Sequence, residues 1–307
     1  MPYSRCPMPF LRIVALWIGL LCITVSCVAS EFDTVYRGAK GLGNLRIWGA
    51  GYYDMTKIEP EDFAPMDSDM FGLMGGLELK RRSGSVLGVY YHYASEETKW
   101  EPNLLDLIDG DAKHHIIGLT FRKPLPLSHI LLNVNGGLDQ YGLRFDSDEA
   151  LKPKGYQANV YPEFGLNIPI GKMIGLKPYL AVHYHYLHHD DISTYWDKAD
   201  YHGLNNLLGL RTNLALGNIF QLQGRASWVH EYLKESPTSL SYFSSLPGHF
   251  TPIRCNFEGD TARDWAWLGV GARLSFGHNL RLFADYDLTL NARQTSHTIS
   301  CCLCLGW

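Results

Sequence analysis

Apolar and polar residues alternate one by one along many short segments of this chain. The last segment is the clearest, because every second residue from Ile299 to Trp307 is apolar and the residues between them are small or polar. The segments 156–168 and 280–288 alternate in the same way. Successive residues of a β-strand point to opposite faces, so this period predicts strands with one apolar face.

Twelve segments of this kind follow one another. They lie near residues 44–55, 69–80, 85–95, 113–122, 129–143, 155–168, 177–187, 204–214, 218–231, 264–276, 279–289 and 296–307. The connections alternate between short and long, with the last one, 290–295, as the exception. Outer-membrane barrels have short turns on the periplasmic side and longer loops outside. The pattern therefore predicts an all-β fold, a twelve-stranded antiparallel transmembrane β-barrel with short periplasmic turns and long extracellular loops.

A soluble β-sandwich or a lipocalin-like barrel is the structural alternative, with the apolar residues inside instead of outside. Three features favour the membrane barrel, and one of them is an export signal combined with an aromatic terminus. The segments reach about 10–14 residues, which is long for soluble strands and suits a tilted crossing of a bilayer. Their polar faces mix glycine and aromatic residues with charges of both signs, as a wet lumen requires. We therefore expect the apolar face to contact outer-membrane lipid.

The N-terminus has the pattern of a secretory signal peptide. Arg5 and Arg12 precede an apolar run over residues 13–25, and small residues follow up to residue 30. An uncleaved membrane anchor and lipoprotein acylation at Cys27 are the alternatives. The predicted organisation is a signal peptide over 1–30, a short periplasmic or lumenal segment over 31–43, and the barrel over 44–307.

Composition agrees with this interpretation and excludes one class of partner. Aromatic residues make up 13 % of the chain, with 18 Tyr and 8 Trp, as expected for a barrel with two aromatic girdles. The formal net charge is -4. Binding to nucleic acid needs a basic surface, so we expect no nucleic-acid partner.

The last four segments resemble the translocator β-domain of autotransporters. The residues that carry the resemblance are Trp228-Val-His-Glu231, the Gly-Val-Gly of 269–271, Tyr286-Asp287 and the closing segment that opens near His297. The resemblance covers about residues 220–307 and is compatible with the strand count over 44–219. It implies a twelve-stranded barrel assembled by the outer-membrane barrel-assembly machinery, which reads the terminal strand. The residues of that assembly signal would be Ile299, Leu303, Leu305 and Trp307.

Two features depart from the family pattern. The chain ends in Trp307, where the family usually ends in Phe. Only residues 31–43 separate the predicted cleavage site from the first strand, and their three glycines make a poor helix. We therefore expect no sizeable passenger, and the family's usual secretion activity is not carried over.

Charged residues on the polar faces are the main candidates for function. These lumen charges are Arg46, Glu78, Lys80, Arg122, Asp139, Glu163, Arg211, Arg225, Arg273, Arg281, Asp285 and Asp287. Buried charges must pair or stay hydrated, so mixed signs suit a network that braces the barrel. The alternative is a charged constriction that selects a small solute.

The densest group of histidines runs from His183 to Asp191. Imidazoles and carboxylates could bind zinc or copper, but strand spacing places only His183 and His185 on one face. We predict no catalytic, cofactor-binding or metal site. After cleavage four cysteines remain, Cys255, Cys301, Cys302 and Cys304, and we expect them to be small apolar side chains without good disulfide geometry.

Three functions remain open on the sequence alone. The first is an autotransporter-like barrel without a sizeable passenger, structural or surface-exposed. The second is a narrow channel for small charged solutes. The third is an outer-membrane hydrolase that uses the histidine group. The longest connection, 232–263, contains three prolines and three phenylalanines and is where we would look for an extracellular partner, whose identity is unknown.

Overall fold

A computed structural model describes residues 44–307 except 60–64, 101–106, 146–149, 153, 172, 191–198, 218, 235–262, 277–279, 293 and 307. The strands are β1 (Leu45–Ile58), β2 (Met66–Lys80), β3 (Val86–Trp100), β4 (Leu107–Pro124), β5 (Ser128–Phe145), β6 (Ala150–Leu151), β7 (Lys154–Leu166), β8 (Ile168–Ile170), β9 (Ile174–His189), β10 (Ala199–Leu216), β11 (Phe220–Lys234), β12 (Asp264–Phe276), β13 (Leu280–Leu290) and β14 (Gln294–Gly306). None of the described residues forms a helix long and apolar enough to cross a membrane.

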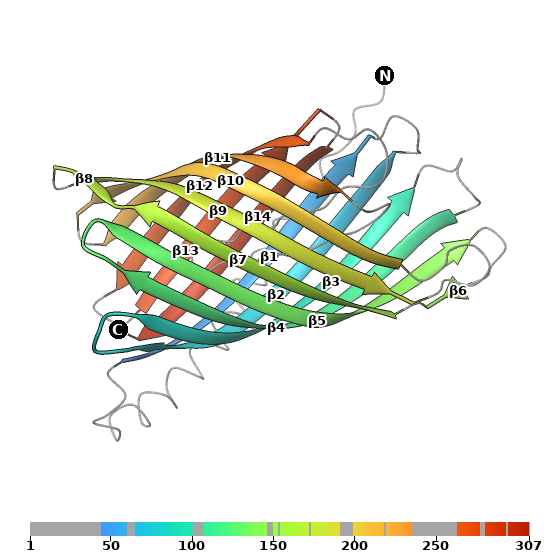
Figure 1. The fold of residues 1–307 in the computed structure, drawn as a ribbon, viewed down its shortest axis with the longest axis horizontal. Coiled ribbons are helices and arrows are strands. Elements are labelled where there is room, and N and C mark those ends of the chain that lie inside the picture. The colour runs from blue at the N-terminus through green and yellow to red at the C-terminus, as the bar shows by residue number, and fades with distance from the viewer. Residues whose placement is uncertain are drawn as a thin grey trace. The chain divides into compact units, whose positions relative to one another are not determined.

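Twelve long strands close into one barrel (Figure 1). Each pairs with its neighbours in chain order, and β1 pairs antiparallel with β14 from Arg46 opposite Gly306 to Ile58 opposite Gln294. The short strands β6 and β8 add only to β5 and β9. The predicted twelve-stranded antiparallel barrel is therefore confirmed.

Several strands are longer than the alternation predicted. Strand β4 begins at Leu107 instead of residue 113, and β10 begins at Ala199 instead of 204. The added residues lie where the long connections join the strands, and they include outward polar residues such as Asp111. Beyond the apolar band an outward residue meets water, so the strand continues although the hydrophobic pattern has ended. The predicted segment 155–168 is divided into β7 and β8.

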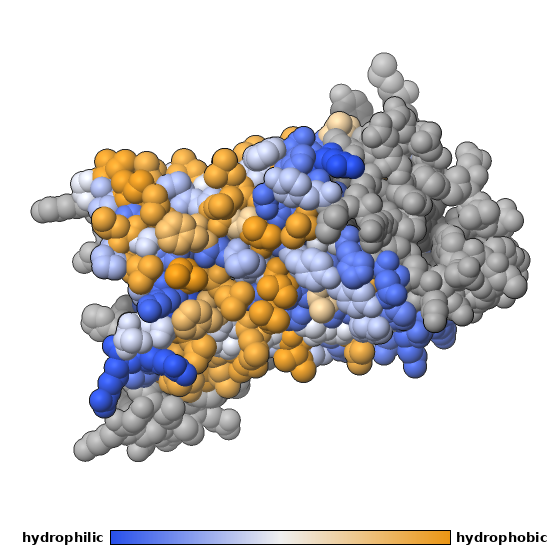
Figure 2. Space-filling view, viewed as in Figure 1, coloured by the Kyte–Doolittle hydropathy of each residue, from blue (hydrophilic) through white to orange (hydrophobic). Residues whose placement is uncertain are grey.

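The two faces of the wall differ as the alternation predicted. Along β7 every second residue is buried, and the inward Asn159 is 0 % exposed whereas the outward Leu138 of β5 is 63 % exposed. Figure 2 shows apolar side chains, in orange, over much of the visible wall, with strongly hydrophilic side chains, in blue, toward both of its ends. The barrel thus has its apolar face outside and its polar face inside.

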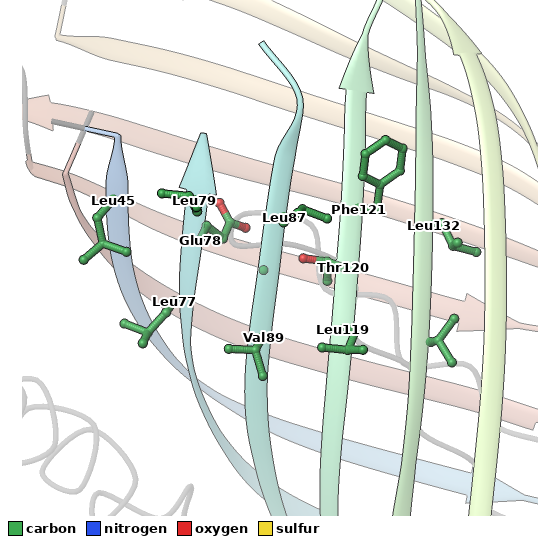
Figure 3. A pocket seen from close by; sticks show the side chains of 12 residues that line it. Leu45, Leu77, Glu78, Leu79, Leu87, Val89, Leu119, Thr120, Phe121 and Leu132 are labelled. Carbon is green, nitrogen blue, oxygen red and sulfur yellow. The ribbon is translucent and has the colours of Figure 1, made fainter. Parts of the chain in front are cut away.

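A shallow apolar hollow of about 620 Å³ lies on this outer face across β1 to β5. Leucine, valine and phenylalanine side chains of neighbouring strands, among them Leu77, Val89 and Leu119, line it (Figure 3). An apolar hollow on an outward face suits the hydrocarbon chains of a bilayer.

The connections between strands sort by length as predicted. Short ones are 81–85, 125–127, 171–173, 217–219 and 277–279, and long ones are 59–65, 101–106, 190–198 and 235–263. Gly84 and Gly217 adopt positive φ angles of 80° and 76° in two of the short turns, a conformation that glycine accepts without strain. Strand β1 begins and β14 ends at this short-turn end, which is the periplasmic end in outer-membrane barrels.

Candidate functional site: the charged barrel interior

All the predicted lumen charges occupy inward positions of their strands. Eight of them are buried: Arg46, Glu78, Asp139, Glu163, Arg211, Arg225, Asp285 and Asp287. Lys80, Arg122, Arg273 and Arg281 alternate with buried residues and keep part of their surface exposed. The barrel therefore encloses a charged interior, and its organisation depends on which side chains pair.

The first ion pair lies near the start of β1. The Arg46 guanidinium donates to the Glu78 carboxylate directly opposite it on β2. Arg122 of β4 approaches the same carboxylate, with its Nη2 4.0 Å from Oε2. The Glu78 carboxylate thus interacts with a cation of β1 and a cation of β4.

The second pair joins β7 to β10 across β9. Arg211 donates from Nη1 to Oε1 of Glu163 at 2.5 Å and from Nη2 to Oε2 at 2.8 Å. The hydroxyl of Tyr161 donates to Oε2 at 2.7 Å, and Nε2 of His129 lies 3.0 Å from Oε1. The guanidinium also lies 3.9 Å above the ring of Tyr179 on β9. Bidentate geometry and these added hydrogen bonds offset the desolvation that a buried charge costs.

The third pair joins β11 to β13 across β12. Arg225 Nε donates to Asp287 Oδ1 at 2.5 Å, and its Nη1 donates to Asp285 Oδ1 at 3.1 Å. Trp267 of β12 donates its indole N–H to Asp287 at 3.1 Å. Gly269 of β12 lies between the partners, and a Cβ there would overlap both Asp287 and Arg225. The glycine therefore creates the space in which the pair meets.

Aromatic side chains use glycines in the same way. Tyr52 of β1 lies over Gly72 of β2, and its hydroxyl is 2.9 Å from Nε2 of His92 on β3. Two further tyrosines repeat the arrangement. Tyr90 lies over Gly118 and its hydroxyl donates to Asn133. Tyr179 lies over Gly209 and its hydroxyl is hydrogen-bonded to Ser227. Each contact links strands that are not hydrogen-bonded neighbours. The sequence predicts glycines on the inward faces but not these contacts, because the contacts depend on the register between strands.

A second network, in the half of the interior nearer the long connections, was also missed. His114 Nδ1 lies 2.7 Å from Oδ1 of Asp139, and its Nε2 lies 3.8 Å from Glu96. Gln157 donates to the same Asp139 oxygen at 2.8 Å. The Ser68 hydroxyl donates to Glu96. In a hydrolase triad the serine hydroxyl donates to the imidazole instead, so this arrangement differs from that of a nucleophile and its base.

The predicted histidine group is divided between the two faces of β9. His183 and His185 are buried inside, with ring centroids 5.4 Å apart, and His183 Nε2 lies 3.2 Å from Oδ1 of Asn159. His188 points outward, and its Nδ1 lies 2.8 Å from Asp200 of β10. Residues 191–198 lie outside the described part. Among the residues that are described, no three His, Cys, Asp or Glu side chains could hold a metal ion.

Outward histidines gather on the part of the outer face that lies away from the short turns. The hydroxyls of Tyr91, Tyr184 and Tyr286 lie within 2.8 Å of imidazole nitrogens of neighbouring strands. Asp200 accepts a hydrogen bond from Tyr186 at 2.6 Å. The Tyr186 hydroxyl, followed by His188, lowers the pKa of the exposed Asp200 carboxyl. Tyrosines and histidines on the outer face are expected of an aromatic girdle in an outer-membrane barrel.

The closing strand has the predicted two faces. Ile299 is 41 % exposed on the outward face and Cys301 is exposed there too, whereas Leu303 is buried. Cys302 and Cys304 lie inside with their Sγ atoms 3.6 Å apart, and all three cysteines are free. Trp307 and Cys255 lie outside the described residues, so their roles remain predictions.

Comparison with known proteins identifies this architecture. The autotransporter β-domain family matches residues 47–287. The translocator domain of autotransporter NalP from Neisseria meningitidis superposes with a TM-score of 0.67 at 13 % identity, over 94 % of this chain and 98 % of that chain. The β-domain of the Bordetella autotransporter Brka superposes with a TM-score of 0.63 at 15 % identity, over 86 % of this chain and 100 % of that chain.

The transport unit of AIDA-I from Escherichia coli gives a TM-score of 0.63 at 13 % identity, over 87 % of this chain and 91 % of that chain. No curated protein matches the sequence. A closed twelve-stranded barrel with an apolar outer face is a protein of the bacterial outer membrane. The family match covers most of the chain and agrees with the fold, so this chain belongs to the autotransporter β-domain family.

Proposed function

We propose that this chain works as an outer-membrane barrel without exporting a sizeable passenger, in a structural or surface-exposed role. One observation carries the proposal: buried ion pairs join strands that are not hydrogen-bonded neighbours. Arg211 reaches Glu163 across β9, and Arg225 reaches Asp287 across β12. These charges neutralise one another along the wall. The barrel interior is therefore stabilised by its own side chains and does not need a transported segment to pair with them.

Such pairs make the wall resistant to opening between strands. Separating β9 from β10 would also break the Arg211 pair, which leaves two charges in a poorly hydrated interior and costs about 3–5 kcal/mol. The segment between β11 and β12 lies outside the described residues, and we propose from its length and sequence that it is accessible from the outside. An extracellular partner would bind there.

The experiment is protease treatment of intact cells that express the full chain with an epitope in the segment between β11 and β12. We expect cleavage of that segment at the cell surface and a barrel that stays in the membrane. Release of a long N-terminal fragment into the medium would contradict the proposal. An epitope in the short turn 81–85 is the matched control and should be protected until the cells are opened.

A second function, a narrow channel for small charged solutes, is favoured by the partly exposed cations of the interior. The experiment is single-channel conductance of the purified barrel in a planar bilayer. Stable steps whose ion preference changes in Arg281→Glu would support a channel. Silence from a correctly folded barrel would exclude it and leave the structural role in place.

The proposed partners during assembly are outer-membrane lipid and the barrel-assembly machinery. The support is the outward apolar residues of β14, which form the predicted assembly signal. Ile299→Asp should reduce the amount of barrel in the outer membrane, whereas Thr295→Asp, at another outward position of the same strand, should reduce it less. An equal reduction in the amount of barrel by both substitutions would contradict an assembly signal in the apolar face. The hydrolase alternative receives less support, because the predicted histidines face opposite sides of β9.

A further inference from the structure

Several cations line the short-turn end of the barrel interior, among them Lys80 at the end of β2 and four cations of other strands. We call Arg122, Lys177, Arg273 and Arg281 the mouth cluster. They come from β4, β9, β12 and β13, and each lies within four residues of the short-turn end of its strand. All four occupy inward positions but keep part of their surface exposed, and the side chain of Arg122 is 30 % exposed. Their charges therefore face the water of the lumen.

The charges of the mouth cluster repel one another. Lys177 stands directly opposite Arg211 in the register between β9 and β10, and like charges in this position destabilise a sheet. Lys177 also lies within electrostatic reach of Arg122 and Arg273. In the same way Arg281 is within reach of both Arg122 and Arg273. Cations from opposite parts of the wall thus converge on one region.

The nearby carboxylates already have partners. Glu163 is held by Arg211 through both oxygens, and Asp285 and Asp287 are held by Arg225. Glu78 accepts from Arg46 through Oε2 and lies 4.0 Å from Arg122, whereas its Oε1 is buried without a hydrogen-bond partner. Within the described part of the chain, no ion pair involves Lys177, Arg273 or Arg281. Nε of Arg273 is buried there without a hydrogen-bond partner. The region is therefore short of negative charge.

The charge of the interior reverses further along the axis. The inward residues nearer the long connections include the carboxylates of Asp54, Glu96, Asp139 and Glu231. An anion that enters from the short-turn end is attracted by the mouth cluster and repelled beyond it. The potential along the axis thus favours retention of an anion at the mouth over its passage.

We propose that the mouth cluster binds a small multivalent oxyanion, of the phosphate or pyrophosphate class, that enters from the periplasmic side. Guanidinium and ammonium groups are the side chains that best recognise such oxygens, through several charge-assisted hydrogen bonds at once. The inward position of the four side chains favours a soluble anion over a lipid headgroup as the source. The inference goes beyond the proposed function, since binding requires neither transport nor a passenger.

The test is isothermal titration of the full chain, purified in detergent, with inorganic pyrophosphate at constant ionic strength set by chloride. We expect saturable binding of pyrophosphate by the native protein. In the double variant Lys177→Gln with Arg273→Gln, the affinity should fall about tenfold for each of the two cations removed. Lys99→Gln combined with Lys113→Gln removes two exposed cations of β3 and β4 near the long connections and should leave the affinity unchanged.

Two results would overturn the inference. One is the absence of saturable binding by the native protein, and the other is an equal loss of affinity in both double variants, which would indicate nonspecific attraction. Heat-modifiable gel mobility checks that each variant is folded, and Arg281→Gln alone gives an independent measurement. A barrel that binds pyrophosphate but does not conduct ions would support this inference and not the channel function. A barrel that conducts ions but does not bind pyrophosphate would support only the channel function.

Discussion

At the scale of single residues, the glycines of the interior decide whether long side chains can meet across a strand. Gly269→Ala places a methyl group where Arg225 and Asp287 join, so we expect it to destabilise the barrel by about 1–3 kcal/mol through overpacking. The measurement is the temperature at which the folded form loses its faster gel mobility. Gly75→Ala is the control, because its Cβ would meet only the Trp48 carbonyl at an ordinary 3.7 Å. Equal effects of the two substitutions would contradict the role of Gly269.

The buried carboxylate of Glu163 gives a second prediction at this scale. Glu163→Gln keeps the shape but removes the charge that Arg211 faces, so we expect a loss of about 3–5 kcal/mol in the free energy of unfolding. Urea titration of the barrel in detergent measures it. Glu97→Gln, at an exposed outward position of β3, should change this free energy by less than about 0.5 kcal/mol. A similarly small effect at Glu163 would mean that the pair contributes little to the wall.

At the scale of elements, the outer ends of β9 and β10 should respond to pH. The Tyr186 hydroxyl and His188 hold the pKa of Asp200 below its ordinary value. A lowered pKa means that the carboxylate stabilises the strand ends above its ordinary pKa, and that this contribution disappears as the pH falls through the lowered value. We expect amide protection factors at the ends of β9 and β10 to fall on acidification in the native protein.

The same measurement on Asp200→Asn provides the control. This variant should show low protection at neutral pH and little further change in acid, because the group that titrates is gone. If native and variant protein lost protection in parallel, the hydrogen bonds of Asp200 would not be the cause.

The sequence predicts the faces of the strands but not the contacts between them. Alternation along each segment fixed the inward face, so the sequence alone was enough to assign Arg225 and Asp287 to the lumen. Their pairing could not be predicted, because they are 62 residues apart and meet only through the register of β11, β12 and β13. Strand ends were missed for a related reason, since outward polar residues such as Asp111 continue a strand beyond the apolar band.

At the scale of the whole molecule, the barrel depends on the pairing that joins its first and last strands. Gly51 of β1 stands directly opposite the exposed Cys301 of β14, although 250 residues separate them along the chain. Directly opposed residues have Cβ atoms about 4.5–5.5 Å apart, within reach of a short thiol cross-linker. We therefore expect Gly51→Cys to be joined to Cys301 by a short bis-maleimide, in a chain whose Cys255, Cys302 and Cys304 are replaced by Ser. The link closes nearly the whole chain into a loop.

That loop persists when the protein is boiled, so the cross-linked chain should migrate differently from the linear chain on a denaturing gel. Gly75→Cys, an outward glycine of β2 that is opposite Gly49 and not Cys301, should give no such species. Cross-linking in neither variant, or in both, would mean that β1 and β14 do not meet in this register. The ion pairs across β9 and β12 stabilise the wall only in a closed barrel, because an open sheet would expose their charges to water and screen them. If Gly51→Cys fails to cross-link to Cys301 because the barrel is open, Glu163→Gln should no longer lower the free energy of unfolding.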